Sequence, residues 1–484
     1  MRLLYRILRW LGIAVGTLLA VILLLFAAAW LINLHDDPLT PQAQALLQIA
    51  PNPYKPEDNI YLAMVGFDAP SGQSVIADGQ ARVDYYDQHL DAVLRDPSAD
   101  AIADLAVKDP RRLRFKGDCN FLHPLDSSVW SEVPQHRDEL QKLMADNREL
   151  YQRYLGLHSL RGYFETARPS YLTPLPGWTS DTRKLFLADL VLRIRSEVPA
   201  QSRTALAELK SDVQTWRAVL RGQGALISKM IAIANLQGDY LVVADMIADP
   251  RLSLSLNDQD ADTLVPPPDL KDWDIGNALA GEFRVSSSVL RQTDELASVN
   301  WISEGQARTG VRGWLNRLSN RIGGHFYKLN ATENLFAART VRQIQAAADP
   351  VRFFGTPNES VTPSLGGRGL WNWRLIYNPV GKILDAIADG AYDDYALRAW
   401  DGAALQRLVR LGYELRRQRI QPAGIPAFLQ QHPEVATHPA DHRPFVWDAQ
   451  RAEIRVQTVA KQRAGRRFFI PVWQPALAAP GAPR

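Results

Sequence analysis

A run of 24 residues without a charged side chain, from Leu11 to Leu34, constrains this chain more than any other feature. At about 1.5 Å per residue, a helix of this length reaches about 36 Å, more than the ~30 Å hydrocarbon core of a bilayer. Three arginines precede the run: Arg2, Arg6 and Arg9. Asp36 and Asp37 follow it. Because positive residues favour the cytoplasmic side, this pattern predicts a transmembrane helix with a cytoplasmic N-terminus.

The same run is also a candidate secretory signal, because Ala27 to Ala29 supply the small residues of a cleavage site. The apolar core of a signal peptide usually spans about 7–15 residues, and this run is longer. An uncleaved anchor over 11–34, after a cytoplasmic segment 1–10, is therefore the preferred interpretation. No second apolar run of comparable length follows, so everything after Asp36 is expected on the far side of the membrane.

The charge balance argues against a nucleic-acid partner. The chain has 55 Lys and Arg against 52 Asp and Glu, and the counts become equal when the three N-terminal arginines are set aside. A nucleic-acid-binding protein normally carries a basic excess or stripe. The predicted partner is the inner membrane, through residues 11–34, and a periplasmic protein is a further candidate.

Arginine far outnumbers lysine and alanine is abundant, a bias typical of GC-rich bacterial genomes. In a bacterium, the far side of the inner membrane is the periplasm. Cys119 is the single cysteine, which excludes an intramolecular disulfide and every multi-cysteine zinc motif. A lone thiol also suits an oxidising space. We therefore expect a single-pass protein of the bacterial inner membrane with most of its chain in the periplasm.

Apolar residues recur at helical spacing through most of the region after the anchor. The pattern predicts helices over 77–107, 137–156, 180–198, 202–220 and 225–248. The last of these is apolar nearly all round, so we expect it to be the most buried. Short connections among the later four favour antiparallel neighbours in a bundle or a solenoid-like array.

A proline-rich break at 265–270 suggests a boundary between two helical subdomains, 35–264 and 265–474. Five prolines make 35–58 look like an extended stalk. Further helices are predicted over 274–298, 331–348 and 393–420, and a disordered tail over 475–484. Two alternating runs, 444–447 and 453–456, predict a β-hairpin. The expected fold is mainly α: a transmembrane helix and an antiparallel helical ectodomain ending in a small β-hairpin.

Three histidines within eleven residues form a candidate site: His432, His438 and His442. A zinc site needs three or four converging ligands. The spacings of six and four, with prolines at 433, 439 and 444, exclude a regular helix that would align them. A loop wrapped around a cation stays open, but histidines that are solvated or hydrogen-bonded to backbone are the preferred interpretation, and no metal site is predicted.

Residues 359–373, ESVTPSLGGRGLWNW, are similar to the Glu-Ser and Gly-Leu elements of lytic transglycosylases, where one glutamate is the general acid. The spacing differs from that family and Glu359 lies in a Pro/Gly-rich stretch, so it is not expected to be catalytic. Trp371, Trp373 and Tyr377 are candidates for an aromatic platform that stacks on a sugar, or else for core rings.

Residues 311–328 are basic and amphipathic. Arg312, Trp314, Arg317 and Arg321 are the candidates for contact with a membrane surface or a partner, against the alternative of an ordinary surface helix. Nucleotide-binding glycine loops, a His-Glu-x-x-His motif and a Gly-x-Ser-x-Gly elbow are all missing, so no cofactor is expected.

Four stretches carry a wider resemblance: NIYLAMVGFDAPSG, KLFLADLVLRIRSEV, LNATENLFAARTV and RPFVWDAQRAEIRV. They resemble a group of functionally uncharacterised bacterial single-span inner-membrane proteins with a large helical periplasmic region. The resemblance implies no catalytic or binding residue. The leading hypothesis is an anchored interaction or envelope-scaffold protein, and the alternative is an envelope-directed hydrolase that uses carboxylates and aromatics around 359–394.

Overall fold

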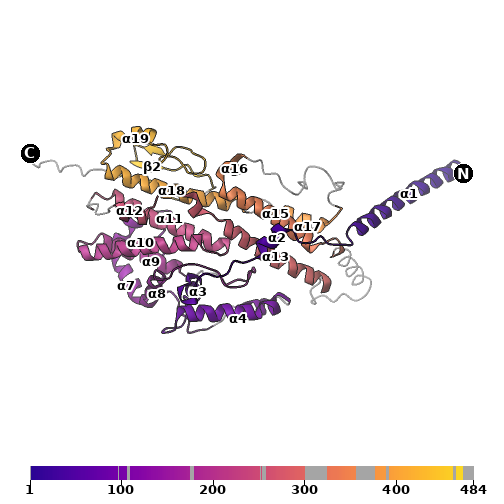
Figure 1. The fold of residues 1–484 in the computed structure, drawn as a ribbon, viewed down its shortest axis with the longest axis horizontal. Helices are drawn as coiled ribbons and strands as arrows, with labels where there is room; N and C mark the ends of the chain where they lie inside the picture. The colour runs from indigo at the N-terminus through magenta and orange to yellow at the C-terminus, as the bar shows by residue number, and fades with distance from the viewer. Residues whose placement is uncertain are drawn as a thin grey trace, which may run out of the picture. The chain divides into compact units, whose positions relative to one another are not determined.

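The computed structural model describes residues 2–95, 98–105, 109–174, 179–250, 252, 258–299, 324–355, 376–388, 392–461 and 465–472 (Figure 1). The chain is mainly helical, with one small antiparallel sheet near the C-terminus. It forms two compact units. Unit 1 comprises Met1–Ile49, Phe283–Arg342 and Pro357–Ala391, and unit 2 comprises Ala50–Glu282, Gln343–Thr356 and Tyr392–Arg484. Each unit combines distant parts of the sequence, unlike the contiguous ranges 35–264 and 265–474.

Unit 1 holds α1 (Arg2–Ile32), α2 (Pro41–Leu47) and α17 (Pro379–Ala388). Two more helices contribute residues to both units, α13 (Gly276–Val299) and α15 (Leu329–Ala348). The core of unit 1 is small and contains Ala43, Phe283, Leu290, Tyr327, Phe336 and Ala337.

The extended stalk expected over 35–58 is wrong for its first half. Pro41 occupies the first turn of α2, and the hydroxyl of Thr40 accepts a hydrogen bond from Ala43 N (3.3 Å) as an N-cap. Ala43 is fully buried in the core of unit 1. The prolines therefore start a short packed helix instead of keeping the chain extended.

Unit 2 contains most of the helices: α3 (Ile60–Val65), α4 (Val75–Arg95), α5 (Ala99–Leu105), α6 (Val129–Glu132), α7 (Arg137–Asp146), α8 (Arg148–Leu157), α9 (Ser180–Ile194), α10 (Pro199–Arg221), α11 (Leu226–Ala248), α12 (Asp258–Leu264), α16 (Pro350–Gly355), α18 (Asp393–Arg417) and α19 (Ile425–Gln431). Short 3-10 turns occupy Pro56–Asp58, Val133–His136, Leu270–Trp273 and Pro422–Gly424. The predicted helices are present, although 77–107 and 137–156 are each divided in two.

Asn147 explains the division of 137–156. Its side-chain amide exchanges hydrogen bonds with the backbone of Lys116, which donates to Oδ1 (2.7 Å) and accepts from Nδ2 (2.9 Å). Nδ2 also donates to Leu143 O (3.0 Å), which ends α7. A buried asparagine that hydrogen-bonds to a distant loop thus separates α7 from α8. The apolar sequence pattern continues through this position and therefore predicted a single helix.

Helix α11 is the core of unit 2 and lies between α10 and α18 (Figure 1). It is buried over most of its length, which confirms the prediction for 225–248. Two carboxylates cap its start, because Glu165 accepts from Ala225 N (2.8 Å) and Glu282 from Leu226 N (3.0 Å). At its end, Arg416 donates to Asp249 O (3.2 Å) and to Ile247 O. Both ends of this long, largely buried helix are therefore satisfied by side chains from other segments.

Two described helices are long and apolar enough to cross a membrane. Tyr5–Ile32 has a mean hydropathy of 2.7 with none of its most apolar stretch buried, whereas Leu226–Ala248 has 1.3 with 78% buried. The second is the core helix α11, so the first is the one whose most apolar stretch is left unburied.

The sheet contains β1 (Val446–Asp448), β2 (Glu453–Arg455) and β3 (Phe469–Pro471) in that order, all antiparallel. The β1–β2 pairing, with Trp447 opposite Ile454, confirms the predicted hairpin. The third strand was not predicted. Ile470 pairs with Ile454, and both are buried, so β3 completes the hairpin and joins it to the core.

We predict that the thiol of Cys119 is inert in the folded protein. Burial raises its pKa to about 12, so the reactive thiolate is scarce at neutral pH. A maleimide should modify Cys119 only after denaturation in urea, as measured by intact mass. Modification of the native chain at the rate of the unfolded chain would contradict this packing.

Candidate functional site

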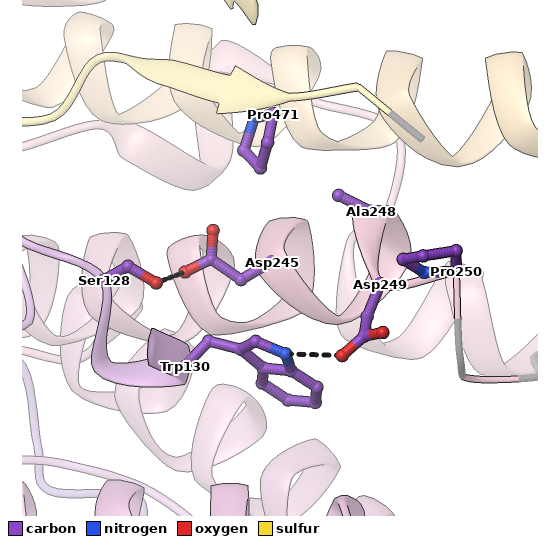
Figure 2. Close-up of a pocket in the computed structure, with 7 residues that line it drawn as sticks. All are labelled: Ser128, Trp130, Asp245, Ala248, Asp249, Pro250 and Pro471. Atoms are coloured by element: carbon purple, nitrogen blue, oxygen red, sulfur yellow. Dashed lines mark hydrogen bonds between the residues drawn. The ribbon is translucent and has the colours of Figure 1, made fainter. Parts of the chain in front are cut away.

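An open pocket lies in unit 2 beside the C-terminal end of α11 (Figure 2). It has a volume of about 350 Å³ and is lined by Ser128, Trp130, Asp245, Ala248, Asp249, Pro250 and Pro471. A neighbouring hollow of about 330 Å³ shares Ser128, Asp245 and Pro471 and adds Asp126, Ser127, Glu453, Arg467 and Phe469. We call the two together the α11–β3 pocket. It is the candidate site because two acidic residues four positions apart, Asp245 in the last turn of α11 and Asp249 at its C-cap, both line it.

Asp245 is the centre of this pocket. Arg467 binds its carboxylate with both terminal nitrogens, Nη2 to Oδ1 (2.8 Å) and Nη1 to Oδ2 (3.0 Å). The hydroxyl of Ser128 donates to Oδ2 (2.7 Å; Figure 2). Both charged residues are buried. The backbone N–H of Arg467 also donates to Leu125 O (2.8 Å). Asp245 on α11 thus contacts the segment before α6 through Ser128 and the segment before β3 through Arg467.

The second acidic residue holds the aromatic wall. The indole Nε1 of Trp130 donates to Asp249 Oδ2 (2.9 Å; Figure 2). Arg195 lies 5.6 Å from the centre of the Trp130 ring and donates to Trp130 O (2.5 Å). These contacts fix the ring at one face and at its polar edge. The aromatic wall of the pocket is therefore held in place by contacts within the chain.

The polar side chains of this pocket are engaged with one another. The residues described as lining the pocket include no histidine or lysine that would activate Ser128 as a nucleophile. Asp245 is neutralised by Arg467, and Glu453 is paired with Arg455 (2.6 Å). Trp130, Pro250 and Pro471 form apolar walls of the pocket. Its carboxylates are already held by hydrogen bonds and ion pairs.

A second set of charges lies wholly inside unit 2. Asp212 accepts hydrogen bonds from Tyr154 OH (2.7 Å) and His158 Nε2 (3.0 Å), while Arg183 forms an ion pair with Asp239. Burial raises the pKa of Asp239 well above its usual range. Burial acts in the same direction on Asp212, but the hydrogen bond from His158 and the charge of Arg183 hold its pKa below the usual value.

Two carboxyl groups with opposed pKa shifts are a pattern of acid–base sites. Here both Asp212 and Asp239 are completely buried, and neither lines the α11–β3 pocket. We therefore assign the cluster to the stability of unit 2. No local sequence pattern announces it, because its members come from α8, α9, α10 and α11.

Ser228 and Lys229 are adjacent on α11 and have the composition of a Ser–Lys catalytic pair. The ammonium of Lys229 instead donates to Val219 O (2.9 Å) and Gly222 O at the end of α10. Ser228 donates to Glu165 Oε1 (2.6 Å). The two side chains serve different partners, so Lys229 acts as a C-terminal cap for α10 and not as a base for Ser228.

The histidine segment anchors a loop. His438 is buried, and its Nε2 donates to Asp401 Oδ1 (3.2 Å) while its Nδ1 accepts from Ala440 N (3.1 Å). His432 lies at the surface near Glu434 (3.3 Å). Within the described part of the chain, no three His, Cys, Asp or Glu side chains are placed to share a metal ion. The structure thus gives His438 a structural partner on α18 and does not bring His442 to it as a second ligand.

The remaining predicted sites fall largely beyond the described residues. Arg312, Trp314, Arg317 and Arg321 lie there, as do Glu359, Trp371 and Trp373. Tyr377 is described and belongs to unit 1, with Lys382 Nζ 5.8 Å from its ring centre. The membrane or partner contact and the aromatic platform stay predictions.

Comparisons with protein-family models, with curated proteins and with solved structures found no match to this chain. The α11–β3 pocket was missed by the sequence analysis because Asp245 and Arg467 are 222 positions apart. The one available signal was a pair of aspartates, Asp245 and Asp249, at the end of an apolar run.

We predict that Arg467→Met lowers the free energy of unfolding by about 3 kcal/mol, because it leaves the Asp245 carboxylate buried without its cation. The matched control is Arg455→Met, whose pair with Glu453 is more exposed and should contribute less than about 1 kcal/mol. Urea unfolding followed by tryptophan fluorescence measures both. Equal losses in the two variants would show that Asp245 does not depend on Arg467.

We also predict that unit 2 gains stability as pH rises above neutrality. Burial lowers the pKa of Lys229 from 10.5 to about 7, so between these values the unfolded chain holds a proton that the folded chain lacks. The free energy of unfolding should then increase by about 1 kcal/mol per pH unit from this residue. Urea titrations of the natural chain and Lys229→Met across that range should differ in slope. Parallel curves would mean that Lys229 stays protonated when folded.

Proposed function

We propose that this chain is a single-pass protein of the bacterial inner membrane whose helical body lies in the periplasm and binds an envelope partner at the α11–β3 pocket. The observation that carries the proposal is α1. None of its most apolar stretch is buried, yet the residue that directly follows the helix, Asn33, is fully buried in unit 1. The arginines before it and the aspartates after it support the cytoplasmic N-terminus.

The end of α1 supports an anchor that is retained. Ala27 to Ala29, the candidate cleavage site, lie within α1, and Ala29 O accepts from Asn33 N (3.2 Å) and Asn33 Nδ2 (2.8 Å). Asn33 is fully buried in unit 1. Cleavage would remove the helix on which this residue packs, so we infer that the folded body keeps its anchor.

The pocket supports an interaction protein over a hydrolase. Its polar side chains bind one another, its aromatic wall is held in place, and its serine lacks a base, as described above. For the hydrolase alternative around 359–394, Asp385 is buried and paired with Arg339 (2.6 Å), and Asp394 is paired with Arg398 (2.6 Å). Asp385 is thus held by its cation in the core, and Asp394 lies in an exposed ion pair on the surface of α18. A preformed hollow with apolar walls and carboxylates that are already paired fits an extended segment of a partner protein.

We predict that the full chain resists extraction by alkaline carbonate and that a C-terminal alkaline phosphatase fusion is active, because the enzyme needs the oxidising periplasm. The intact mass of the mature protein should show that its first residues are retained. Activity of a C-terminal fusion that folds only in the cytoplasm, or a mature chain starting near Trp30, would reject the anchored topology.

We predict that a photo-crosslinking amino acid in place of the exposed Pro250 captures a reproducible envelope protein in living cells. The same amino acid at Val198, which is 49% exposed in the same unit, is the control and should not capture it. Identical products at both positions would show that capture reflects exposure alone and would reject the pocket as the binding site.

A further inference from the structure

We infer that unit 1 carries a lipid-docking face, formed by Ile376, Ile383 and Ile387, which inserts into the interfacial layer of the membrane that α1 crosses. This inference rests on the proposed anchoring of α1 and adds a second, peripheral contact with the same bilayer. It follows from four features of unit 1: a clamp, a cap, an aromatic cluster and an exposed helix face.

The clamp is Asn33, at the end of α1. Its Nδ2 donates to Ile376 O (2.6 Å), and its Oδ1 accepts from Asn378 N (2.8 Å). Both bonds reach the backbone, so they fix residues 376–378 against the last turn of the apolar helix. Ile376, with a side chain 39% exposed, therefore lies at the level where α1 leaves the hydrocarbon layer.

The cap is Asp36, three residues further on. Its carboxylate accepts from Asn330 N (2.8 Å) and Ala331 N (3.0 Å), the free N–H groups at the start of α15. Thr40 N also donates to Asn334 Oδ1 (2.8 Å) on the same helix. The connection between α1 and unit 1 is thus tied down on α15, which fixes the direction in which unit 1 faces the bilayer.

The aromatic cluster surrounds the last turns of α1. Trp30 stacks on His325 with ring centres 3.6 Å apart, and His325 Nε2 donates to Trp30 O (2.9 Å). Phe326 lies 6.0 Å from Phe26 and 6.1 Å from Trp30. Tryptophan at the end of a spanning helix marks the membrane–water interface. Because Phe26 and Trp30 belong to the apolar stretch, residues 325–326 of the folded body reach the same depth.

The exposed face belongs to α17, which starts directly after the clamp. Val380 and Leu384 pack on the core of unit 1. Ile383 and Ile387 are 42% and 74% exposed, four residues apart, and so share the outer side of the helix. Lys382 Nζ donates to Tyr377 O (2.6 Å), which keeps a basic group beside this face. An apolar helix face bordered by a basic side chain fits the interfacial layer of a bilayer.

Lipid is the occupant that the structure favours, because the face adjoins the end of an apolar helix whose most apolar stretch is not buried. A second copy of the chain would also cover these isoleucines, and the test below separates that outcome from lipid contact. Unit 1 would then hold the base of the anchor rigid and rest on the membrane surface beside it.

The test uses the full chain in vesicles of phosphatidylethanolamine and phosphatidylglycerol. Ile387→Cys is labelled with an environment-sensitive NBD fluorophore, and Cys119 should stay unlabelled because it is buried. Vesicle lipids that carry a spin label in the headgroup region should quench this probe several-fold more than a probe at the control Val198→Cys. Ile383→Cys is the second probe, in case the first variant does not fold.

The outcomes separate this inference from the proposed function. Carbonate extraction of the same vesicles reports whether α1 is inserted. A resistant chain whose probes at 383 and 387 are quenched no more than the control overturns the docking face and leaves the anchor intact. Protection of the probes without lipid quenching, increasing with protein density, assigns the face to a second copy and also overturns it. Release by carbonate rejects the anchor and the docking face together.

Discussion

The burial of α11 over most of its length is the constraint on which the rest of unit 2 depends. A helix so largely buried cannot leave its terminal N–H and C=O groups, or the charges on its buried positions, to water. Glu165 and Glu282 therefore meet its start, and Arg416 meets its end. Its internal charges have partners as well, since Asp239 is paired with Arg183 and Asp245 with Arg467. Each of these partners comes from a different segment. The hydrogen bonds and ion pairs that α11 requires therefore hold those segments around it.

The α11–β3 pocket follows from the same requirement. Asp245 and Asp249 lie at the end of α11. Their hydrogen-bond donors come from Ser128 and Trp130 near the start of α6 and from Arg467 before β3. The chain segments that bring Ser128, Trp130 and Arg467 leave a hollow between them. The lining of the pocket is held in place because it also closes the core. A partner that binds there would meet groups whose hydrogen bonds are already made, which suits recognition by shape and apolar contact.

Features encoded locally could be predicted from the sequence. Hydropathy alone identified α1 and α11, and alternation identified β1 and β2, because each depends on residues within one short segment. Features that depend on distant residues could not. Asn147 interrupts a helix to serve Lys116, Pro41 starts a packed helix because Ala43 has a core to enter, and Arg467 finds Asp245 across most of the chain. For the same reason the pocket had no sequence signature, and His438 proved to be a structural residue.

The charges of α11 have a further consequence for biogenesis. In the topology that we propose, α11 passes through a translocation channel, where a segment this apolar risks partitioning sideways into lipid and becoming a second span. Asp239 lies near its middle, with Lys229 and Asp245 on either side, and a charged residue at the centre of a span costs about 2.5–3.5 kcal/mol to insert. We expect these residues to keep the nascent segment moving through the channel. After folding, Arg183 and Arg467 neutralise the charges of Asp239 and Asp245 in the core. The same two aspartates would thus oppose membrane insertion first and stabilise the folded unit afterwards.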